Sequence, residues 1–153
     1  MGWGRSTAVQ GARVAALVAA AVAVGCAAWA AAPASVALGE RFELGAGESA
    51  RIEGEDVAVE LEAVVADSRC AVGVTCVWEG DAAVRVRLRV GSQPAELLEL
   101  HTAGRAGGAA GAAHGFRVRL VGLEPYPVEG RATRPEAYRA TLEVARGAAG
   151  PER

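Results

Sequence analysis

Val57-Ala-Val-Glu-Leu-Glu-Ala-Val-Val65 is the stretch of sequence that decides the fold. Its apolar side chains return at every second position, which is the period of a β-strand with one buried face. Residues 84–90, 116–120 and 138–144 repeat this alternation, with arginine, threonine or glutamate at most of the intervening positions. The residues expected on the buried face of the first stretch are Val57, Val59, Leu61, Ala63 and Val65.

Shorter strands are expected around these four. They are residues 41–44, 50–53 and 96–102, separated by glycine-containing turn signals. The pattern requires no amphipathic helix. About seven short strands favour an all-β fold, namely an antiparallel, immunoglobulin-like β-sandwich, with a small open barrel as the alternative.

Three segments are expected to lie outside the strands. Residues 103–113 are almost all glycine and alanine, which indicates a mobile hairpin tip. Residues 125–135 contain three prolines, which favour a longer extended excursion. Residues 147–153 are expected to form a flexible tail. The β domain is therefore expected over residues 36–146.

The first 35 residues are typical of an export signal with a short tether. Residues 1–13 are polar and contain two arginines, and residues 14–24 are an uninterrupted run of Val, Ala and Leu. Ala23-Val-Gly-Cys26 resembles a lipobox, in which Cys26 would be lipidated, whereas Ala32-Pro-Ala34 fits ordinary signal peptidase.

An uncleaved anchor is the third possibility for this segment, because its apolar stretch approaches the roughly 20 residues needed to span a bilayer. We expect cleavage by one of the two enzymes, with a slight preference for the lipobox. The protein is then exported, either lipid-anchored in the cell envelope or extracellular, and its membrane contact is the N-terminal lipid or the uncleaved anchor.

The chain has 153 residues and a formal net charge of -2. This length accommodates one domain of ordinary size. Both arginines of the signal are lost on cleavage, so the exported part is more acidic still. A mildly acidic domain is poorly suited to nucleic acid, and we expect no such partner.

Three cysteines leave an even pair once Cys26 is assigned to the signal or to a lipid. Outside the cytoplasm, Cys70 and Cys76 are then expected to form a disulfide. Closing so short a loop contributes about 2 to 2.5 kcal/mol, so the bridge mainly fixes the shape of one loop. A tetrahedral metal site with His101 or His114 is the alternative, but no second short-spaced ligand pair supports it. We expect no metal and no cofactor.

Two groups of motifs carry a resemblance. They are Asp67-Ser-Arg-Cys70 with Cys76-Val-Trp-Glu-Gly80, and Leu123-Glu-Pro-Tyr-Pro127 with Tyr138-Arg-Ala-Thr-Leu142. The chain resembles an uncharacterised family of small exported, often lipid-anchored bacterial proteins with a D-S-R-C loop, a C-x-W-x-G strand start and a P-Y-P loop. Ala71 departs from the pattern, in which proline follows the first cysteine. The resemblance implies an envelope location and a compact β domain, and implies no catalysis.

The segment around the two later cysteines is the most distinctive candidate site. A disulfide-fixed turn beside an aromatic and several charges is pre-organised for a partner. The plainer interpretation, which we prefer, is that Trp78 covers the disulfide in the core, Asp67 makes an Asx-type turn and Gly80-Asp81 provides hairpin geometry. Tyr126 is either a contact residue or the tyrosine of a sandwich corner. The candidate binding residues are Asp67, Arg69, Trp78, Glu79, Asp81 and Tyr126.

Arginines at alternating positions form a possible basic ladder. Arg85, Arg87 and Arg89 share one strand face, and Arg117 and Arg119 share another. Such a ladder could bind anionic lipid headgroups or polysaccharide. Ion pairing is the preferred interpretation, because glutamates occupy matching outward positions on other strands. These glutamates are Glu60, Glu62, Glu99 and Glu143.

We predict a non-catalytic module with an unknown protein or envelope ligand. The alternative is a small secreted inhibitor or ligand-carrying domain, and a small hydrolase is less favoured. The chain lacks a G-x-S-x-G motif, and only His101 and His114 are available as bases. An enzyme would require a cleft that brings one of these histidines to a carboxylate of Asp67, Glu79 or Asp81.

Overall fold

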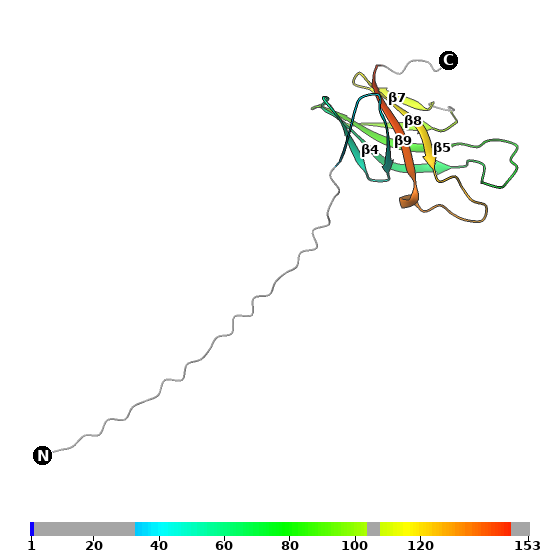
Figure 1. Cartoon of the computed structure of the whole chain (residues 1–153), viewed down its shortest axis with the longest axis horizontal. Helices are drawn as coiled ribbons and strands as arrows, with labels where there is room; N and C mark the ends of the chain where they lie inside the picture. Colours follow the sequence, from blue (N-terminus) through cyan, green and yellow to red (C-terminus); the bar gives the residue numbers. More distant parts are fainter. Residues whose placement is uncertain (2–32, 104–107, 148–153) are drawn as a thin grey trace. The chain divides into compact units, whose positions relative to one another are not determined.

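The computed structural model describes Met1, residues 33–103 and residues 108–147. Cys26, most of the expected export signal and tether, and most of the expected tail lie outside the described residues. The elements within the described part are β1 (Ala34–Val36), β2 (Arg41–Gly45), β3 (Ser49–Ile52), β4 (Val57–Asp67), β5 (Ala82–Val90), β6 (Glu96–His101), β7 (Ala110–Ala113), β8 (Phe116–Glu124), the 3-10 helix η1 (Pro135–Ala137) and β9 (Arg139–Arg146) (Figure 1).

The strands form two sheets that pack together as a β-sandwich. One sheet has the order β1-β3-β4-β5-β6 and the other β2-β9-β8-β7. All pairs are antiparallel except β1 with β3, which is parallel. The all-β sandwich is therefore confirmed, with two more strands than the seven expected. Among the described residues, no helix has the length and apolar character needed to cross a bilayer.

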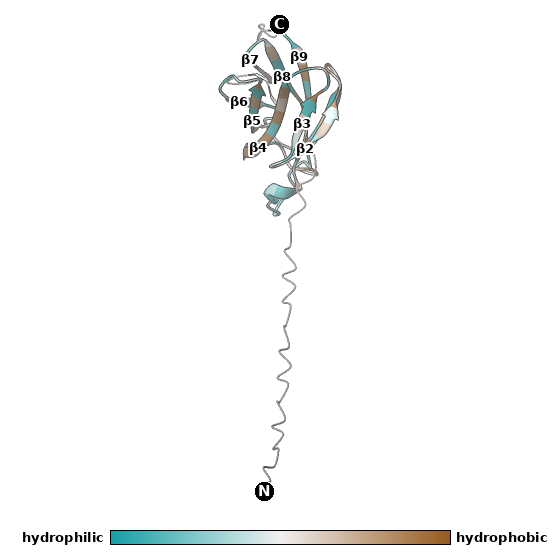
Figure 2. Ribbon diagram, turned by 90° about the vertical axis from the view of Figure 1, so that its left-hand side faces the viewer, coloured by the Kyte–Doolittle hydropathy of each residue, from teal (hydrophilic) through white to brown (hydrophobic). Residues whose placement is uncertain are grey.

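The core lies between the sheets and uses the predicted alternation. Figure 2 shows hydrophobic and hydrophilic residues alternating along the strands. On β5, Val84, Val86 and Leu88 are fully buried, and on β9, Leu142 and Val144 are fully buried. Burying each such side chain contributes about 1.5 to 3 kcal/mol. The period of two in the sequence thus predicts correctly which faces of these strands are buried between the two sheets.

The alternation expected along β4 is wrong beyond Leu61. The pairing of β4 with β5 shifts register between Leu61 and Ala63 and again between Val64 and Ala66. Because a bulge inserts an unpaired residue, it exchanges the two faces of the strand. Val64 consequently packs against the core, and Val65, expected inside, is exposed.

The glycine and alanine segment is not a featureless hairpin tip. Ala110–Ala113 form β7, which pairs with β8 through a tight turn at His114-Gly115 with positive φ angles of 51° and 80°. A Cβ atom on Gly111 would lie 3.2 Å from side-chain atoms of Leu98 and Leu100. Small residues are needed here because the edge strands β6 and β7 approach closely.

Ion pairing is confirmed for Arg85, Arg87 and Arg89. Arg87 lies 3.9 Å from Glu60 and 3.3 Å from Glu62. The other pairs between strands are Arg89 with Glu60 at 3.7 Å, Arg85 with Glu99 at 3.8 Å and Arg41 with Glu143 at 3.5 Å. Pairs this exposed stabilise the fold by at most about 1 kcal/mol each.

Candidate functional site

Two loops project from the same end of the sandwich (Figure 1). The cysteine loop, residues 68–81, joins β4 to β5, and the P-Y-P loop, residues 125–134, joins β8 to η1. The amide of Val72 donates to the carbonyl of Pro127 at 2.9 Å, and Val72 forms an isolated β-bridge with Val128. The two loops therefore lie side by side, and we call them together the tip.

The predicted disulfide is present within the cysteine loop. Cys70 and Cys76 are bonded, with their Cα atoms 6.0 Å apart. Both sulfurs are consumed by this bond, so the alternative metal site loses its thiolates. Among the described residues there is also no cluster of three His, Cys, Asp or Glu side chains suited to a metal ion.

The base of the cysteine loop continues the β4–β5 ladder. The amide of Ser68 donates to the carbonyl of Asp81 at 2.7 Å, and that of Cys70 donates to the carbonyl of Glu79 at 2.9 Å. Gly80 has a φ of 71°, and a Cβ there would lie 1.9 Å from the carbonyl oxygen of Ser68. Only glycine fits this close approach of the two sides of the loop.

A buried arginine joins the two loops. Arg69 donates to both carboxylate oxygens of Asp67, at 2.9 and 2.7 Å, and its side chain is only 4% exposed. The same guanidinium donates to the carbonyl of Leu123 and, at 2.8 Å, to that of Pro125. It also stacks over the ring of Tyr126 at 4.4 Å. We call Asp67, Arg69 and their partners the clasp.

Asp67 serves as the anchor of the clasp. It accepts from the amide of Arg69 at 3.2 Å, which is the expected Asx-type turn, and from the hydroxyl of Tyr138 at 3.0 Å. Burial disfavours the carboxylate, but the hydrogen bonds from Arg69 and Tyr138 outweigh it, so the pKa of Asp67 is lowered. Burial, together with the Asp67 carboxylate, raises the pKa of Tyr138.

Asp81 forms a second polar cluster at the edge of the tip. Its carboxylate accepts from the amide of Ala103 at 2.9 Å and the hydroxyl of Thr102 at 3.1 Å, and lies 2.6 Å from Nδ1 of His101. Burial opposes ionisation, but these hydrogen bonds prevail and the pKa of Asp81 is lowered. Because a carboxylate only accepts, Nδ1 of His101 carries the proton.

This cluster bears on the enzyme alternative. It brings His101 to a carboxylate, as that alternative requires. The ring is largely buried, however, and its other nitrogen, Nε2, faces Glu99 at 3.6 Å. A groove of about 770 Å³ beside Trp78 is lined by Asp81, and His101 is not one of its lining residues. His114 lies elsewhere, with Nε2 3.1 Å from the carbonyl of Pro94.

Several large apolar side chains are exposed on the tip. Val77 is 92% exposed and Trp78 is 73% exposed. The preferred sequence interpretation, in which Trp78 covers the disulfide within the core, is wrong. Trp78 lies in the cysteine loop, outside both β4 and β5. Other large apolar side chains exposed on the tip are Val72, Val74, Tyr126 and Val128.

The six candidate residues therefore divide into three groups. Trp78, Glu79 and Tyr126 are exposed on the tip. Asp67 and Arg69 lie beneath it in the clasp, and Asp81 binds His101 at its edge. Sequence reasoning missed Val77, Val72 and Val128 as surface residues. Their signal was valine in segments that contain turn-forming glycine or proline, Gly73 in the cysteine loop and Pro127 in the P-Y-P loop.

Comparison of the chain with protein-family models, with curated proteins and with solved structures found no match.

Proposed function

We propose that this protein is a non-catalytic, exported binding module, and that the tip is the surface with which it contacts a partner protein. The observation that carries the proposal is the exposure of Val77 and Trp78, at 92% and 73%, on a loop fixed by a disulfide and a buried clasp. Water-exposed apolar side chains gathered in one place are typical of an interaction surface. Aromatic residues are enriched among the residues that dominate binding.

The rigidity of the tip supports the same function. The disulfide, the ladder at the loop base and Arg69 hold both loops before any partner arrives. A pre-ordered loop loses less conformational entropy on association than a free one, so more of its contact energy appears as affinity. A loop of similar composition without these restraints would bind more weakly.

The exposed charges of the tip are balanced. They are Glu79 and Glu129 against Arg131 and Arg134, and Arg134 pairs with Glu136 on η1 at 3.2 Å. Charge therefore gives the tip no preference for an acidic or a basic partner, and the proposal depends on the exposed apolar side chains.

Export and anchoring belong to the proposal. A disulfide is typical of a compartment outside the cytoplasm, which supports export. The lipobox-like sequence that ends at Cys26 and the resemblance to small envelope proteins support a lipid anchor. Intact mass of the exported protein tests this directly: we expect a diacylated N-terminal Cys26 and no thiol that alkylates without reduction.

A small inhibitor is the second candidate, because a rigid apolar wedge also suits the cleft of a target enzyme. We place catalysis last, since His101 is largely buried between Asp81 and Glu99. Both leading candidates require the same contact surface, and they differ in whether the partner loses activity when the tip binds.

Site-specific photo-crosslinking tests the proposal. A photoreactive residue replaces Val77 on the tip or, as the control, Leu97, an exposed apolar residue on β6. Irradiation of intact cells should join the Val77 derivative to one discrete protein and leave the Leu97 derivative uncoupled. Equal products from both positions, or none from Val77, would refute the tip as the contact surface.

A further inference from the structure

The outer face of the five-stranded sheet has a small hollow, and none of its lining residues belongs to the tip. It has a volume of about 110 Å³, and Ala58 on β4 is one of its lining residues. Ala58 pairs with Arg51 on β3 and with Arg89 on β5. Because neighbouring strands lie about 4.8 Å apart, the two arginine backbones are about 10 Å apart, with only a methyl group between them.

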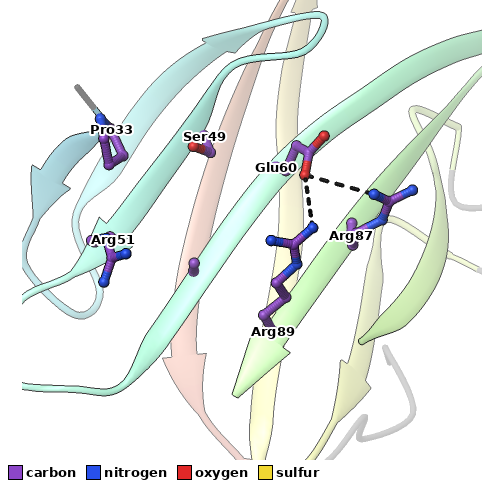
Figure 3. A pocket seen from close by; sticks show the side chains of 7 residues that line it. Pro33, Ser49, Arg51, Glu60, Arg87 and Arg89 are labelled. Carbon is purple, nitrogen blue, oxygen red and sulfur yellow. Dashed lines mark ion pairs between the residues drawn. The ribbon is translucent and has the colours of Figure 1, made fainter. Parts of the chain in front are cut away.

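The walls of the hollow are basic. Figure 3 shows Arg51 on one side and Arg87 and Arg89 on the other, with Glu60 reaching both of the latter. Counting the Glu62 carboxylate that pairs with Arg87, these three arginines and two glutamates leave one net positive charge. Within the part of the chain that the structure describes, Arg51 has neither an ion pair nor a side-chain hydrogen bond.

The ion pairs leave guanidinium donors available. Glu60 lies 3.7 Å from Arg89 and 3.9 Å from Arg87, beyond the usual hydrogen-bond length of about 3.2 Å. Each guanidinium carries five N–H donors in a planar fork that matches the oxygens of a phosphate or carboxylate. Ser49, whose hydroxyl can also donate, lines the same hollow.

We propose that this hollow binds one phosphate-type oxyanion between Arg51 and Arg89. The negative charge of the oxyanion balances the net positive charge of the hollow. Its oxygens accept from guanidinium N–H groups that Glu60 does not engage. The absence of a large side chain at position 58 provides the space. The site is independent of the tip, and the proposed function does not depend on it.

The phosphate group can come from two sources. Pro33 lines the hollow and lies seven residues after Cys26 in the sequence. At about 3.5 Å per residue, a chain leaving a lipidated Cys26 reaches Pro33 within about 25 Å, so an anionic lipid headgroup is within range. That source rests on the proposed anchor. A free phosphate or phosphate ester needs no anchor.

Titration with inorganic phosphate tests the site itself. The probe is added to the exported protein at constant ionic strength, and the Nε–H resonances of the arginines are followed by NMR. We expect saturable shifts at Arg51 and Arg89. Arg51→Ala should weaken binding about tenfold, as expected for the loss of a charged hydrogen bond. Arg85→Ala is the matched control on the same strand face, outside the hollow, and should change affinity little.

Vesicles then separate the two sources. The protein without its N-terminal lipid is used here, because acyl chains would bind to any vesicle. Binding to phosphatidylcholine vesicles that contain phosphatidylglycerol, abolished by Arg51→Ala but not by Arg85→Ala, assigns the headgroup. Phosphate binding without vesicle binding assigns a free phosphate group and still supports the site. Shifts that do not saturate, or an equal loss of affinity in the two variants, would show diffuse attraction to the whole sheet face and overturn the proposal.

Discussion

Replacing Arg69 by methionine should destabilise the protein by about 3 kcal/mol, although the residue lies in a loop. The change keeps an unbranched apolar side chain of similar length and removes the guanidinium. Asp67 would then be a carboxylate only 7% exposed with no cation beside it. Breaking a buried pair in this way costs about 3 to 5 kcal/mol. The hydroxyl of Tyr138, which still donates to Asp67, places the expected value at the lower end.

Urea unfolding with the disulfide intact measures this free energy. Arg85→Met is the matched control, because it makes the same chemical change in an exposed pair with Glu99 at 3.8 Å. It should cost less than about 1 kcal/mol. If Arg69→Met costs no more than the control, the guanidinium does not join the loops, and the reasoning about the clasp is refuted.

Hydrogen exchange locates the loss. The amide of Val72 donates across the two loops to Pro127, whereas the amide of Cys70 donates within the cysteine loop to Glu79. In Arg69→Met, the protection of Val72 should fall further than the protection of Cys70, because the disulfide still holds its own loop. Equal loss at both amides would indicate that the whole tip unravels together.

Three further outcomes are expected. The pKa values of Asp67 and Asp81 are lowered in the folded state, so folding favours their carboxylates. Their contribution to the free energy of unfolding is complete above the unfolded pKa of about 3.9 and is lost as pH falls through the lower folded pKa values. Acid titration followed by circular dichroism should show a smaller loss in Asp67→Asn. Gly80→Ala should cost more than about 1 kcal/mol in thermal or urea unfolding, because its Cβ meets the carbonyl of Ser68, whereas Gly73→Ala, with φ 84° and open space around it, should cost only the strain of a positive φ. Reducing the disulfide should cost about 2 to 2.5 kcal/mol and leave the sandwich folded, which far-ultraviolet circular dichroism before and after reduction would check; complete unfolding on reduction would contradict the minor role given to this short loop.

The fold could be predicted from the alternation of apolar and polar residues, but the β-bulges that interrupt this alternation could not. Val84, Val86 and Leu88 are buried as their alternation predicts, because a strand in a sandwich has one face toward the core. Val65 obeys the same pattern in sequence and is nevertheless exposed. The bulges responsible arise from how β4 pairs with β5, which a single strand's sequence does not contain.

In the candidate site, too, the local features could be predicted and the contacts between distant loops could not. Asp67 and Arg69 could be singled out from their motif, and the Asx-type turn follows from local geometry. The acceptors of Arg69 at Leu123 and Pro125 lie 54 and 56 residues away, so the clasp depends on the packing of distant loops. Trp78 was misjudged for a related reason. Whether an aromatic residue is buried depends on which layer covers it, and the cysteine loop extends beyond both sheets.

Charged and apolar side chains have exchanged their usual places at the tip. Charged groups that are costly to bury are placed beneath the surface and fully paired, as Asp67 and Arg69 are, while Val77 and Trp78, which gain by burial, remain in water. A sequence selected for stability alone would favour the reverse arrangement. Because the clasp is complete without Val77 or Trp78, the fold does not account for these two side chains. Their apolar surface is removed from water only when another molecule covers it, which is why we propose the tip as the contact surface.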